Sequence, residues 1–175
     1  MKTKNLQMNF EKLVLRIQET NDFLLKNAVK AVNTHLTLRN WLTGFYIVEF
    51  EQNGSDRAEY GAKLLENIAK NIRVKGLTAP ELSRCRQFYK TYPQILGLIT
   101  QEFKNILPFD LLTENVDKSI LGLPTQELQN DDLKQVLSIF QNISYTHFTE
   151  LIKIEDSTKR QFYELLILKT QPSVS

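Results

Sequence analysis

The chain has 175 residues, of which 42% are hydrophobic and 24% charged, a balance typical of folded rather than disordered proteins. Cys85 is its only cysteine, which excludes an internal disulfide and a thiolate zinc cluster and favours a reducing, cytoplasmic setting. The longest apolar run, Phe45 to Val48, is far shorter than the roughly 20 residues that span a bilayer, and the N-terminus is polar. We therefore expect a cytoplasmic protein with no membrane insertion.

Charge is unevenly distributed along the chain. Residues 1–56 carry a formal charge of +1, residues 57–104 carry +5 and residues 105–175 carry −4. The middle third is therefore the basic block, where contact with a phosphate backbone is most favourable. An excess of this size is also common on a solvated protein face, so charge alone leaves both interpretations open.

Helical periodicity dominates the N-terminal segment, residues 1–56. The segment contains no proline, and Gly44 is the only glycine before its end. Its apolar side chains recur at intervals of three and four, which indicates a stripe along one side of a helix. The stripe comprises Phe10, Leu13, Val14, Ile17, Phe23, Leu24, Ala28, Val32 and Leu36. Asn21-Asp22 predicts a break between a first helix and a long second one, which ends near Gln52-Asn53-Gly54. We expect both helices to pack on the rest of the chain.

Residues 57–93 form a second segment, which begins with a predicted helix over Ala58–Arg73. The glycine-containing run Lys75-Gly76-Leu77 reads as the end of this helix. The face of the helix predicted to point outward is basic. It carries Lys63, Lys70 and Arg73.

The sharpest local signal follows, in the run Thr78-Ala79-Pro80-Glu81. The Thr78 hydroxyl can accept a hydrogen bond from an amide of the first helical turn, while Glu81 reaches back to the Thr78 amide. Proline in that turn costs little, because its missing donor would be unpaired anyway. We therefore predict a helix from Pro80 to Thr91. The helix, the glycine turn and this capped helix together predict a helix-turn-helix-like unit.

The C-terminal part, residues 94–175, has an acidic balance and is also predicted to be helical. Its predicted helices lie at Ile95–Ile106, Leu111–Ile120, Gln126–Phe140, Ser144–Lys153 and 156–168, with caps at Ser144 and at Asp156 or Ser157. No alternating strand pattern is long enough to build a sheet. The predicted fold is an all-α multi-helix bundle that contains the helix-turn-helix-like unit and forms one compact domain overall.

No residue pattern in the sequence indicates a catalytic site. The six glycines match neither a phosphate loop nor a dinucleotide fingerprint. His35 and His147 lack the spacing of metal ligands, and the lone Cys85 is most simply a half-buried small residue. Asp110 with Asp132-Leu133-Lys134 imitates a nuclease site, but the second run is predicted at a helix start, where acids favour the helix dipole. We expect no catalytic residue, metal or cofactor in this chain.

The helix-turn-helix-like unit instead predicts a surface for binding. In a helix-turn-helix, the second helix offers its N-terminal residues to base edges in the major groove. Arginine can bridge guanine, glutamine can bridge adenine, and serine or threonine reaches phosphates or bases. The candidates for DNA contact are Lys75, Thr78, Ser83, Arg84, Arg86, Gln87 and Lys90. The alternative is that Arg86, Gln87 and Tyr89 form a structural set of ion pairs and hydrogen bonds.

Several stretches are similar to a known family. Residues 57–65 read RAEYGAKLL, residues 84–89 read RCRQFY, and residues 143–156 read ISYTHFTELIKIED. In that order they resemble RAEYGKKVIE, RRMRQFY and LSWSHYRELLKIKD of the N-terminal domain of YhcG-type PD-(D/E)XK nuclease-like bacterial proteins. Arg160-Gln161-Phe162-Tyr163 is similar to the REFY that follows. The resemblance extends from about Leu13 to Leu168.

The resemblance implies a helical domain of uncharacterised function that lies in front of a nuclease-like domain. The family's linking WSVRELERQI would begin where this chain ends, so we expect an excised N-terminal domain or a natural short form. The chain departs from the family's pattern at two of these positions: a tryptophan is Tyr145 here, and the arginine before Arg84 is Ser83, which weakens the basic face. The resemblance and the basic block together predict a non-catalytic domain that targets DNA, mainly by neutralising phosphates and therefore weakly at high salt.

A rival of a different class is a protein-interaction or homo-oligomerisation module with no nucleic-acid contact. Ten phenylalanines and six tyrosines are enough to supply an apolar docking face. An exposed aromatic stripe of Trp41, Phe45, Tyr46 and Phe88–Tyr92 would favour this rival. A continuous basic surface across Lys75–Lys90 would favour DNA instead.

Overall fold

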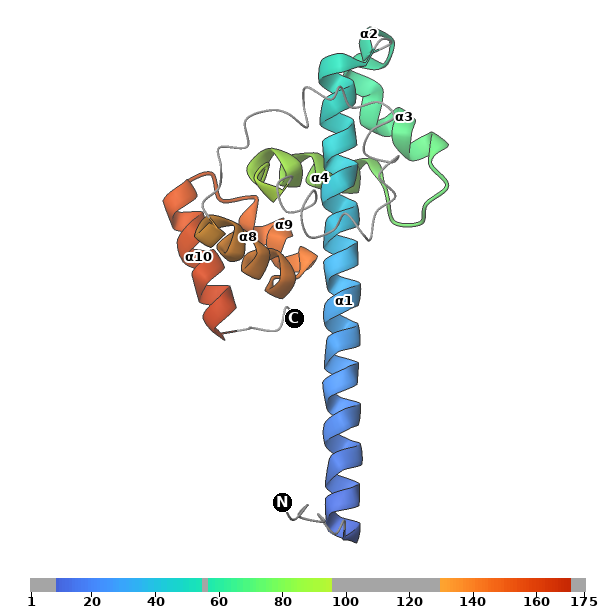
Figure 1. The fold of residues 1–175 in the computed structure, drawn as a ribbon. Coiled ribbons are helices and arrows are strands. Elements are labelled where there is room, and N and C mark those ends of the chain that lie inside the picture. The colour runs from blue at the N-terminus through green and yellow to red at the C-terminus, as the bar shows by residue number, and fades with distance from the viewer. Residues whose placement is uncertain (1–8, 55–56, 96–129, 171–175) are drawn as a thin grey trace.

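A computed structural model describes residues 9–54, 57–95 and 130–170 of the chain. Every regular element among these residues is a helix, so the predicted all-α class is confirmed. In chain order they are α1 (Phe10–Asn53), α2 (Arg57–Tyr60), the 3₁₀ helix η1 (Gly61–Lys63), α3 (Leu64–Asn71), α4 (Ala79–Thr91), α8 (Asn130–Asn142), α9 (Tyr145–Leu151) and α10 (Ser157–Thr170) (Figure 1). Apart from Ile95, the short helices predicted over 95–106 and 111–120 lie outside the described residues.

The first helix, α1, is continuous over 44 residues, and the predicted break at Asn21-Asp22 is wrong. Asparagine and aspartate each cost a helix only about 0.7 kcal/mol relative to alanine, and neither removes a main-chain donor as proline does. The helix begins after Asn9, whose side chain accepts a hydrogen bond from the Lys12 amide. It ends at Asn53, immediately before Gly54, as predicted.

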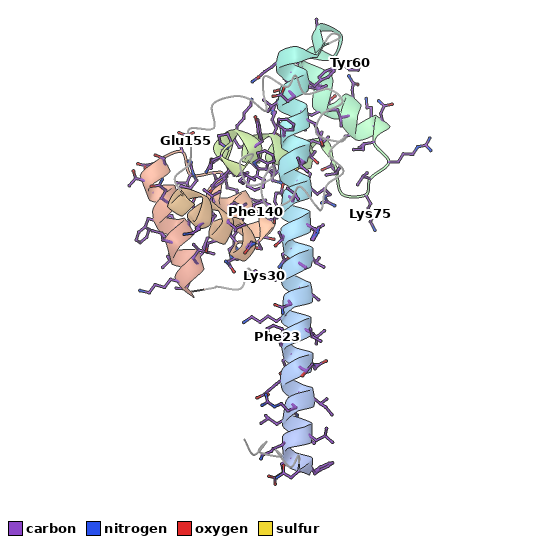
Figure 2. All side chains as sticks on the ribbon, in the orientation of Figure 1. Phe23, Lys30, Tyr60, Lys75, Phe140 and Glu155 are labelled. Atoms are coloured by element: carbon purple, nitrogen blue, oxygen red, sulfur yellow. The ribbon has the colours of Figure 1, made fainter. Side chains whose placement is uncertain are left out.

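The N-terminal half of α1 projects away from the other helices (Figure 1). Every residue from 9 to 33 is exposed, and burial begins at Thr37. We call residues 10–36 the stalk; Phe23 and Lys30 extend from it in Figure 2. Among the described residues, it is the part of α1 after the stalk that packs on the other helices.

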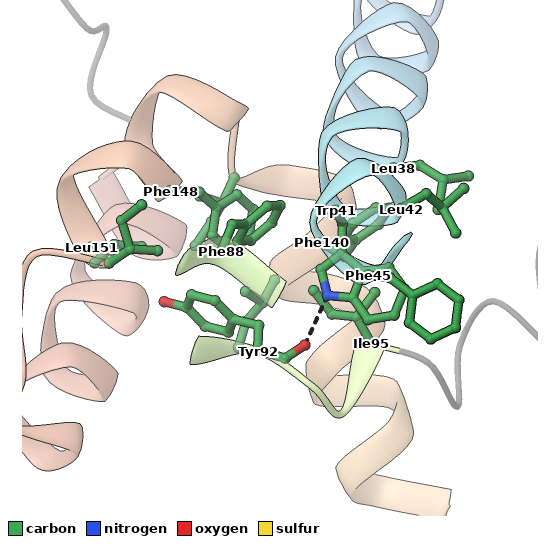
Figure 3. Close-up of a cluster of buried hydrophobic side chains, with 13 residues drawn as sticks. Leu38, Trp41, Leu42, Phe45, Phe88, Tyr92, Ile95, Phe140, Phe148 and Leu151 are labelled. Carbon is green, nitrogen blue, oxygen red and sulfur yellow. Dashed lines mark hydrogen bonds between the residues drawn. The ribbon is translucent and has the colours of Figure 1, made fainter. Parts of the chain in front are cut away.

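The main core lies where α1, α4 and the C-terminal helices meet (Figure 3). Trp41, Phe88 and Phe148 are fully buried there, and the ring centroids of Phe88 and Phe148 are 4.7 Å apart. The Trp41 indole N–H donates a hydrogen bond of 2.9 Å to the main-chain carbonyl of Tyr92. The one polar atom of the indole ring is therefore satisfied inside an apolar core.

A smaller core joins α3 to α1 and α4, and it is formed by Ile47, Leu64, Leu77 and Leu82. The helix predicted over Ala58–Arg73 is instead divided into α2, η1 and α3, because Gly61 adopts a φ of +41° that a regular helix does not allow. Residues 72–78 then form a seven-residue connection to α4. A helix-turn-helix uses a turn of about three to four residues, so the predicted helix-turn-helix outline is not confirmed.

The last two helices begin where their capping residues predict. The Ser144 hydroxyl accepts a hydrogen bond of 3.5 Å from the His147 amide at the start of α9. The Asp156 carboxylate accepts one of 2.9 Å from the Lys159 amide at the start of α10. Both bonds satisfy amides that the first turn of a helix leaves unpaired.

Candidate nucleic-acid interface

The candidate interface is built on α4, which lies in the middle of the protein rather than on its outside. Leu82, Cys85 and Phe88 bury one face of this helix completely. The helix also comes very close to α1, because a Cβ added to Gly44 would lie 1.9 Å from the main-chain oxygen of Cys85. Only the remaining face of α4 is available to a ligand.

One flank of that remaining face is joined to α1 by an ion pair. The Arg86 guanidinium donates a hydrogen bond of 2.6 Å to Glu51 in the last turn of α1, and the Lys90 ammonium lies 3.8 Å from the same carboxylate. An acid at a helix C-terminus is disfavoured by the helix dipole, so the two cations offset that cost. These contacts support the structural interpretation of Arg86. Glu51 is not among the residues predicted from the sequence. An acid in the last turn of a helix that has no basic residue there would have indicated that a cation from elsewhere pairs with it.

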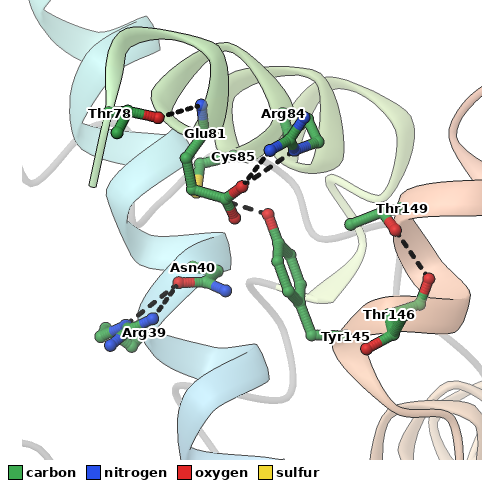
Figure 4. Close-up of polar contacts among 9 residues, drawn as sticks. All are labelled: Arg39, Asn40, Thr78, Glu81, Arg84, Cys85, Tyr145, Thr146 and Thr149. Atoms are coloured by element: carbon green, nitrogen blue, oxygen red, sulfur yellow. Dashed lines mark hydrogen bonds and ion pairs between the residues drawn. The ribbon is translucent and has the colours of Figure 1, made fainter. Parts of the chain in front are cut away.

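The opposite flank of α4 is joined to α9 (Figure 4). Arg84 donates hydrogen bonds of 2.9 and 2.7 Å to the Glu81 carboxylate, which also accepts one from the Tyr145 hydroxyl. The hydrogen bond with Glu81 and its charge raise the pKa of Arg84. The Thr78 half of the predicted capping box is present, with 3.4 Å between the Glu81 amide and the Thr78 hydroxyl. The Glu81 carboxylate instead accepts the hydrogen bonds from Arg84 and Tyr145, and so it connects α4 to α9.

The other candidate residues lie between these flanks or before α4. Ser83 is half-buried, whereas Gln87 is exposed and donates a hydrogen bond of 3.5 Å to the Thr91 hydroxyl. Thr78 is exposed as well as capping the helix. Lys75 lies on the outer side of the connection that leads into α4 (Figure 2).

A continuous basic surface would favour DNA binding, and an exposed aromatic stripe would favour protein interaction. Neither surface is present as expected. The region from Lys75 to Lys90 is not continuously basic, because Glu51 and Glu81 pair with its cations. The aromatic stripe is not exposed either, since of its members on α1 only Tyr46 is substantially exposed, at 42%. The structure instead exposes a different apolar surface, the stalk, and a different group of cations.

Four of the cations in front of α4 are exposed and make no ion pair among the described residues. They are Lys63 and, nearer to α4 in the sequence, Lys70, Arg73 and Lys75. Lys70 and Arg73 lie on the face that was predicted to point outward, and both are exposed, but neither is among the residues predicted for DNA contact. Unpaired ammonium and guanidinium groups keep their full attraction for an anionic ligand, whereas paired ones must first lose a partner.

A groove of about 500 Å³ lies beside these cations, between α1 and α3. Its walls are mainly apolar, with Phe50 and Ile68 among them, and Tyr60 and Asn67 contribute polar atoms. None of the lining side chains is charged. This lining suits an apolar group rather than a phosphate.

The histidines and the nuclease-like run have ordinary local contacts. His35 Nδ1 lies 2.7 Å from the Ala31 carbonyl oxygen, and His147 Nδ1 lies 2.8 Å from the Ser144 hydroxyl. In the described part of the chain, no three histidine, cysteine or acidic residues come together to hold a metal ion. Residues 132–134 lie within α8, whereas Asp110 is outside the described residues. No helix among the described residues is long and apolar enough to cross a membrane.

Cys85 provides a pH-dependent test of the packing between α4 and α9. Burial raises the pKa of its thiol from 9.0 to about 11, and the thiol lies 3.6 Å from the Tyr145 hydroxyl. The unfolded chain therefore releases this proton at lower pH than the folded protein. We expect the free energy of unfolding to fall as pH rises above about 9, and this contribution to be fully lost above about 11.

Urea denaturation at pH about 8 and about 9.5 measures this loss, before most unfolded tyrosines ionise. The matched variant is Cys85→Ala, which removes the thiol and should reduce the difference in stability between the two pH values. An unchanged difference in this variant would show that Cys85 does not cause the pH dependence.

These features describe an all-α domain in which an ion pair joins the central helix α4 to α1 and a hydrogen bond joins it to α9. The chain belongs to the family of DUF1016 N-terminal domains, whose family model matches residues 16–109. This finding confirms the family resemblance seen in the sequence.

A relative from Escherichia coli (strain K12), "Putative nuclease YhcG", is 27% identical to the chain over 150 residues. The match covers 83% of this chain and 37% of the relative, so the chain spans little more than a third of that protein's length. No solved structure matches the chain.

Proposed function

We propose that this domain binds nucleic acid through the cations in front of α4 and positions the nuclease-like domain of a longer protein. The observation that carries the proposal is that Lys70, Arg73 and Lys75 are exposed and make no ion pair among the described residues. They belong to a region, residues 57–95, with eight basic and three acidic residues. The E. coli relative is named as a putative nuclease, which supports nucleic acid as the class of ligand.

Neutralisation of phosphates would supply most of the binding free energy. Thr78 precedes α4, and Ser83 and Gln87 lie on its second and third turns. These residues would add hydrogen bonds to phosphates or base edges. Lys90 has a half-exposed side chain and only a distant contact with Glu51, so it remains available as a further cation.

Arg84 and Arg86 have a different role in this proposal. Each is paired with a carboxylate that connects α4 to a neighbouring helix, so each holds α4 in position. Their replacement would change the orientation of the whole interface as well as its charge. The domain itself contributes no catalytic group, and cleavage belongs to the nuclease-like domain.

The double variant Arg73→Ala/Lys75→Ala tests the proposal. We expect it to weaken binding to a mixed-sequence DNA duplex by about tenfold at low salt, and to lower the salt slope by about one unit for each lost phosphate contact. Fluorescence anisotropy at two salt concentrations measures both effects. The matched control is Lys26→Ala/Lys30→Ala, which removes the same charge from the stalk.

No binding by the unaltered chain at low salt would refute the proposal for this domain. Equal losses in the two double variants would refute the location, since they would indicate a general effect of net charge. Trp41 is the only tryptophan, and its fluorescence reports whether each variant is folded.

A second candidate function, a protein-interaction module, is favoured by the stalk. A helix that is exposed over residues 9–33 leaves large apolar side chains in water, with Phe10 79% and Ile17 60% exposed. Contiguous apolar surface of this kind is typical of an interface with another protein.

A further inference from the structure

The stalk carries a narrow apolar stripe along one side. It differs from the stripe predicted from the sequence, because the helical rotation places Leu13, Phe23 and Leu24 outside it. With about 100° of rotation per residue, ten of its positions fall within roughly 100° of arc, the width of a helix face that meets a partner. Gln18 and His35 lie at the two edges of this arc, and the other eight residues form the stripe. They are Phe10, Val14, Ile17, Asn21, Leu25, Ala28, Val32 and Leu36. The six large apolar members are between 37% and 79% exposed.

The charged side chains of the stalk lie almost entirely on its other side. Glu11 stands at the edge of the stripe, and the same rotation per residue places the remaining charges on the opposite half of the helix. These are Lys12, Arg16, Glu19, Asp22, Lys26 and Lys30. Apolar side chains occur on both sides of the stalk, because Leu15 and Phe23 lie among the charges. Charge, however, is almost absent from the stripe, and this indicates that the stripe is the side that is covered in the assembled protein.

The spacing of the stripe is symmetric about Asn21. Three pairs of stripe residues stand at equal separations from it, at eleven, seven and four positions. The pairs are Phe10 with Val32, Val14 with Ala28, and Ile17 with Leu25. Two antiparallel stalks that cross at Asn21 therefore bring each of these residues opposite a stripe residue of the other copy. The two outer pairs match a larger side chain with a smaller one, which favours close packing.

We propose that the stalk binds the stalk of a second copy of this chain, antiparallel, with a two-fold axis at Asn21. The inference deepens the second candidate function, because it names the partner. On the axis, the side-chain amide of each Asn21 can donate a hydrogen bond to Asn21 of the other copy and accept one from it. A polar residue inside an apolar seam selects one register at some cost in stability.

The antiparallel arrangement also agrees with the shape of the protein. The globular part lies at one end of α1, so an antiparallel pair keeps the two globular parts apart (Figure 1). The overlap of residues 10–32 is about 35 Å long. A two-helix contact of this length is smaller than the roughly 800 Å² per partner of a standard interface, so we expect a dissociation constant on the order of micromolar.

Engineered cysteines test this register directly. Under mild oxidation, Asn21→Cys is expected to give a disulfide-linked dimer, because the two positions meet on the axis. Ile17→Cys and Leu25→Cys are each expected to stay unlinked alone and to link when mixed, because each position faces the other in the second copy. Lys26→Cys, on the charged side, is the matched control and is expected to stay unlinked. Cys85 is buried, so the unaltered chain provides the blank.

Two results would overturn the proposal. If Ile17→Cys alone links as well as its mixture with Leu25→Cys, the pair is parallel and the antiparallel arrangement is wrong. If Asn21→Cys does not link, and the unaltered chain has the mass of a monomer in light scattering at about 100 μM, far above the expected dissociation constant, there is no stalk dimer.

Substitution by aspartate provides a second test. Ile17→Asp/Leu25→Asp places four carboxylates in the seam of the dimer and is expected to raise the dissociation constant at least about 100-fold. Leu15→Asp/Phe23→Asp changes two exposed apolar residues outside the stripe and is expected to change the constant less than about threefold. Equal effects of the two double variants would refute the stripe as the interface.

The nucleic-acid proposal is tested separately by the salt dependence of DNA binding. A chain that is monomeric yet binds DNA in a salt-sensitive way would refute only the stalk dimer. A dimer that does not bind DNA would refute only the nucleic-acid proposal.

Discussion

Replacement of Gly44 by alanine is expected to lower the free energy of unfolding by about 3 kcal/mol or more, because it forces α1 and α4 apart. The added Cβ would lie 1.9 Å from the main-chain oxygen of Cys85 and 3.0 Å from the Cβ of Tyr89. The nearest obstacle is main chain, which cannot rotate away as a flexible side chain can. Urea denaturation followed by Trp41 fluorescence measures the loss.

The matched control is the same substitution at Gly76. This glycine has a φ of +94°, but a Cβ there would meet nothing within 4 Å. Its replacement by alanine therefore costs only the conformational preference, about 1 kcal/mol. If Gly44→Ala costs no more than Gly76→Ala, the close approach of α1 to α4 is wrong.

Replacement of Phe88 by alanine is expected to lower the free energy of unfolding by about 3 to 5 kcal/mol. Phe88 has no exposed surface, and its ring lies 4.7 Å from that of Phe148 and 5.7 Å from that of Tyr92, measured between centroids. Its removal leaves a cavity among rings that the surrounding helices hold in place. Thermal or urea denaturation measures the change.

Phe23→Ala provides the control for this prediction, because it makes the same chemical change on the stalk, where Phe23 is 66% exposed. We expect its effect on the unfolding of the globular part to stay within about 0.5 kcal/mol. Similar losses for Phe88→Ala and Phe23→Ala would contradict the described core.

Local sequence signals predicted where several helices begin. Thr78, Ser144 and Asp156 each accept a hydrogen bond from an amide three residues later, as predicted for capping residues. These predictions succeed because the bond that defines a cap joins neighbours in the sequence. The end of α1 before Gly54 is predictable for the same reason.

Predictions of helix continuity were less reliable, because they weigh small costs. Asn21-Asp22 lowers helix propensity but does not interrupt α1. Gly61, which looked compatible with a helix, adopts a left-handed conformation and divides the predicted helix. A glycine permits either conformation at similar cost, so its neighbours in the folded protein decide between them.

The candidate site was predictable as a set of residues but not as an arrangement. Arg84 and Arg86 are close in the sequence, yet they lie on opposite flanks of α4 and pair with different carboxylates. Glu51 is 35 residues from Arg86 along the chain. Arg84 pairs with Glu81 three residues earlier on the same helix, a spacing that the sequence shows. Only the packing of α1 on α4 shows that Arg86 is paired with Glu51.

The amino-acid sequence by itself determined that the chain is helical, where its caps lie, and that residues 10–36 have an apolar side. It did not determine which apolar sides are buried. The apolar residues from Leu38 to Phe45 are buried because α4, α8 and α9 reach that part of α1, whereas no described helix reaches the stalk. Periodicity depends on neighbours along one helix, but burial depends on contacts between distant segments, so only the tertiary structure decides it.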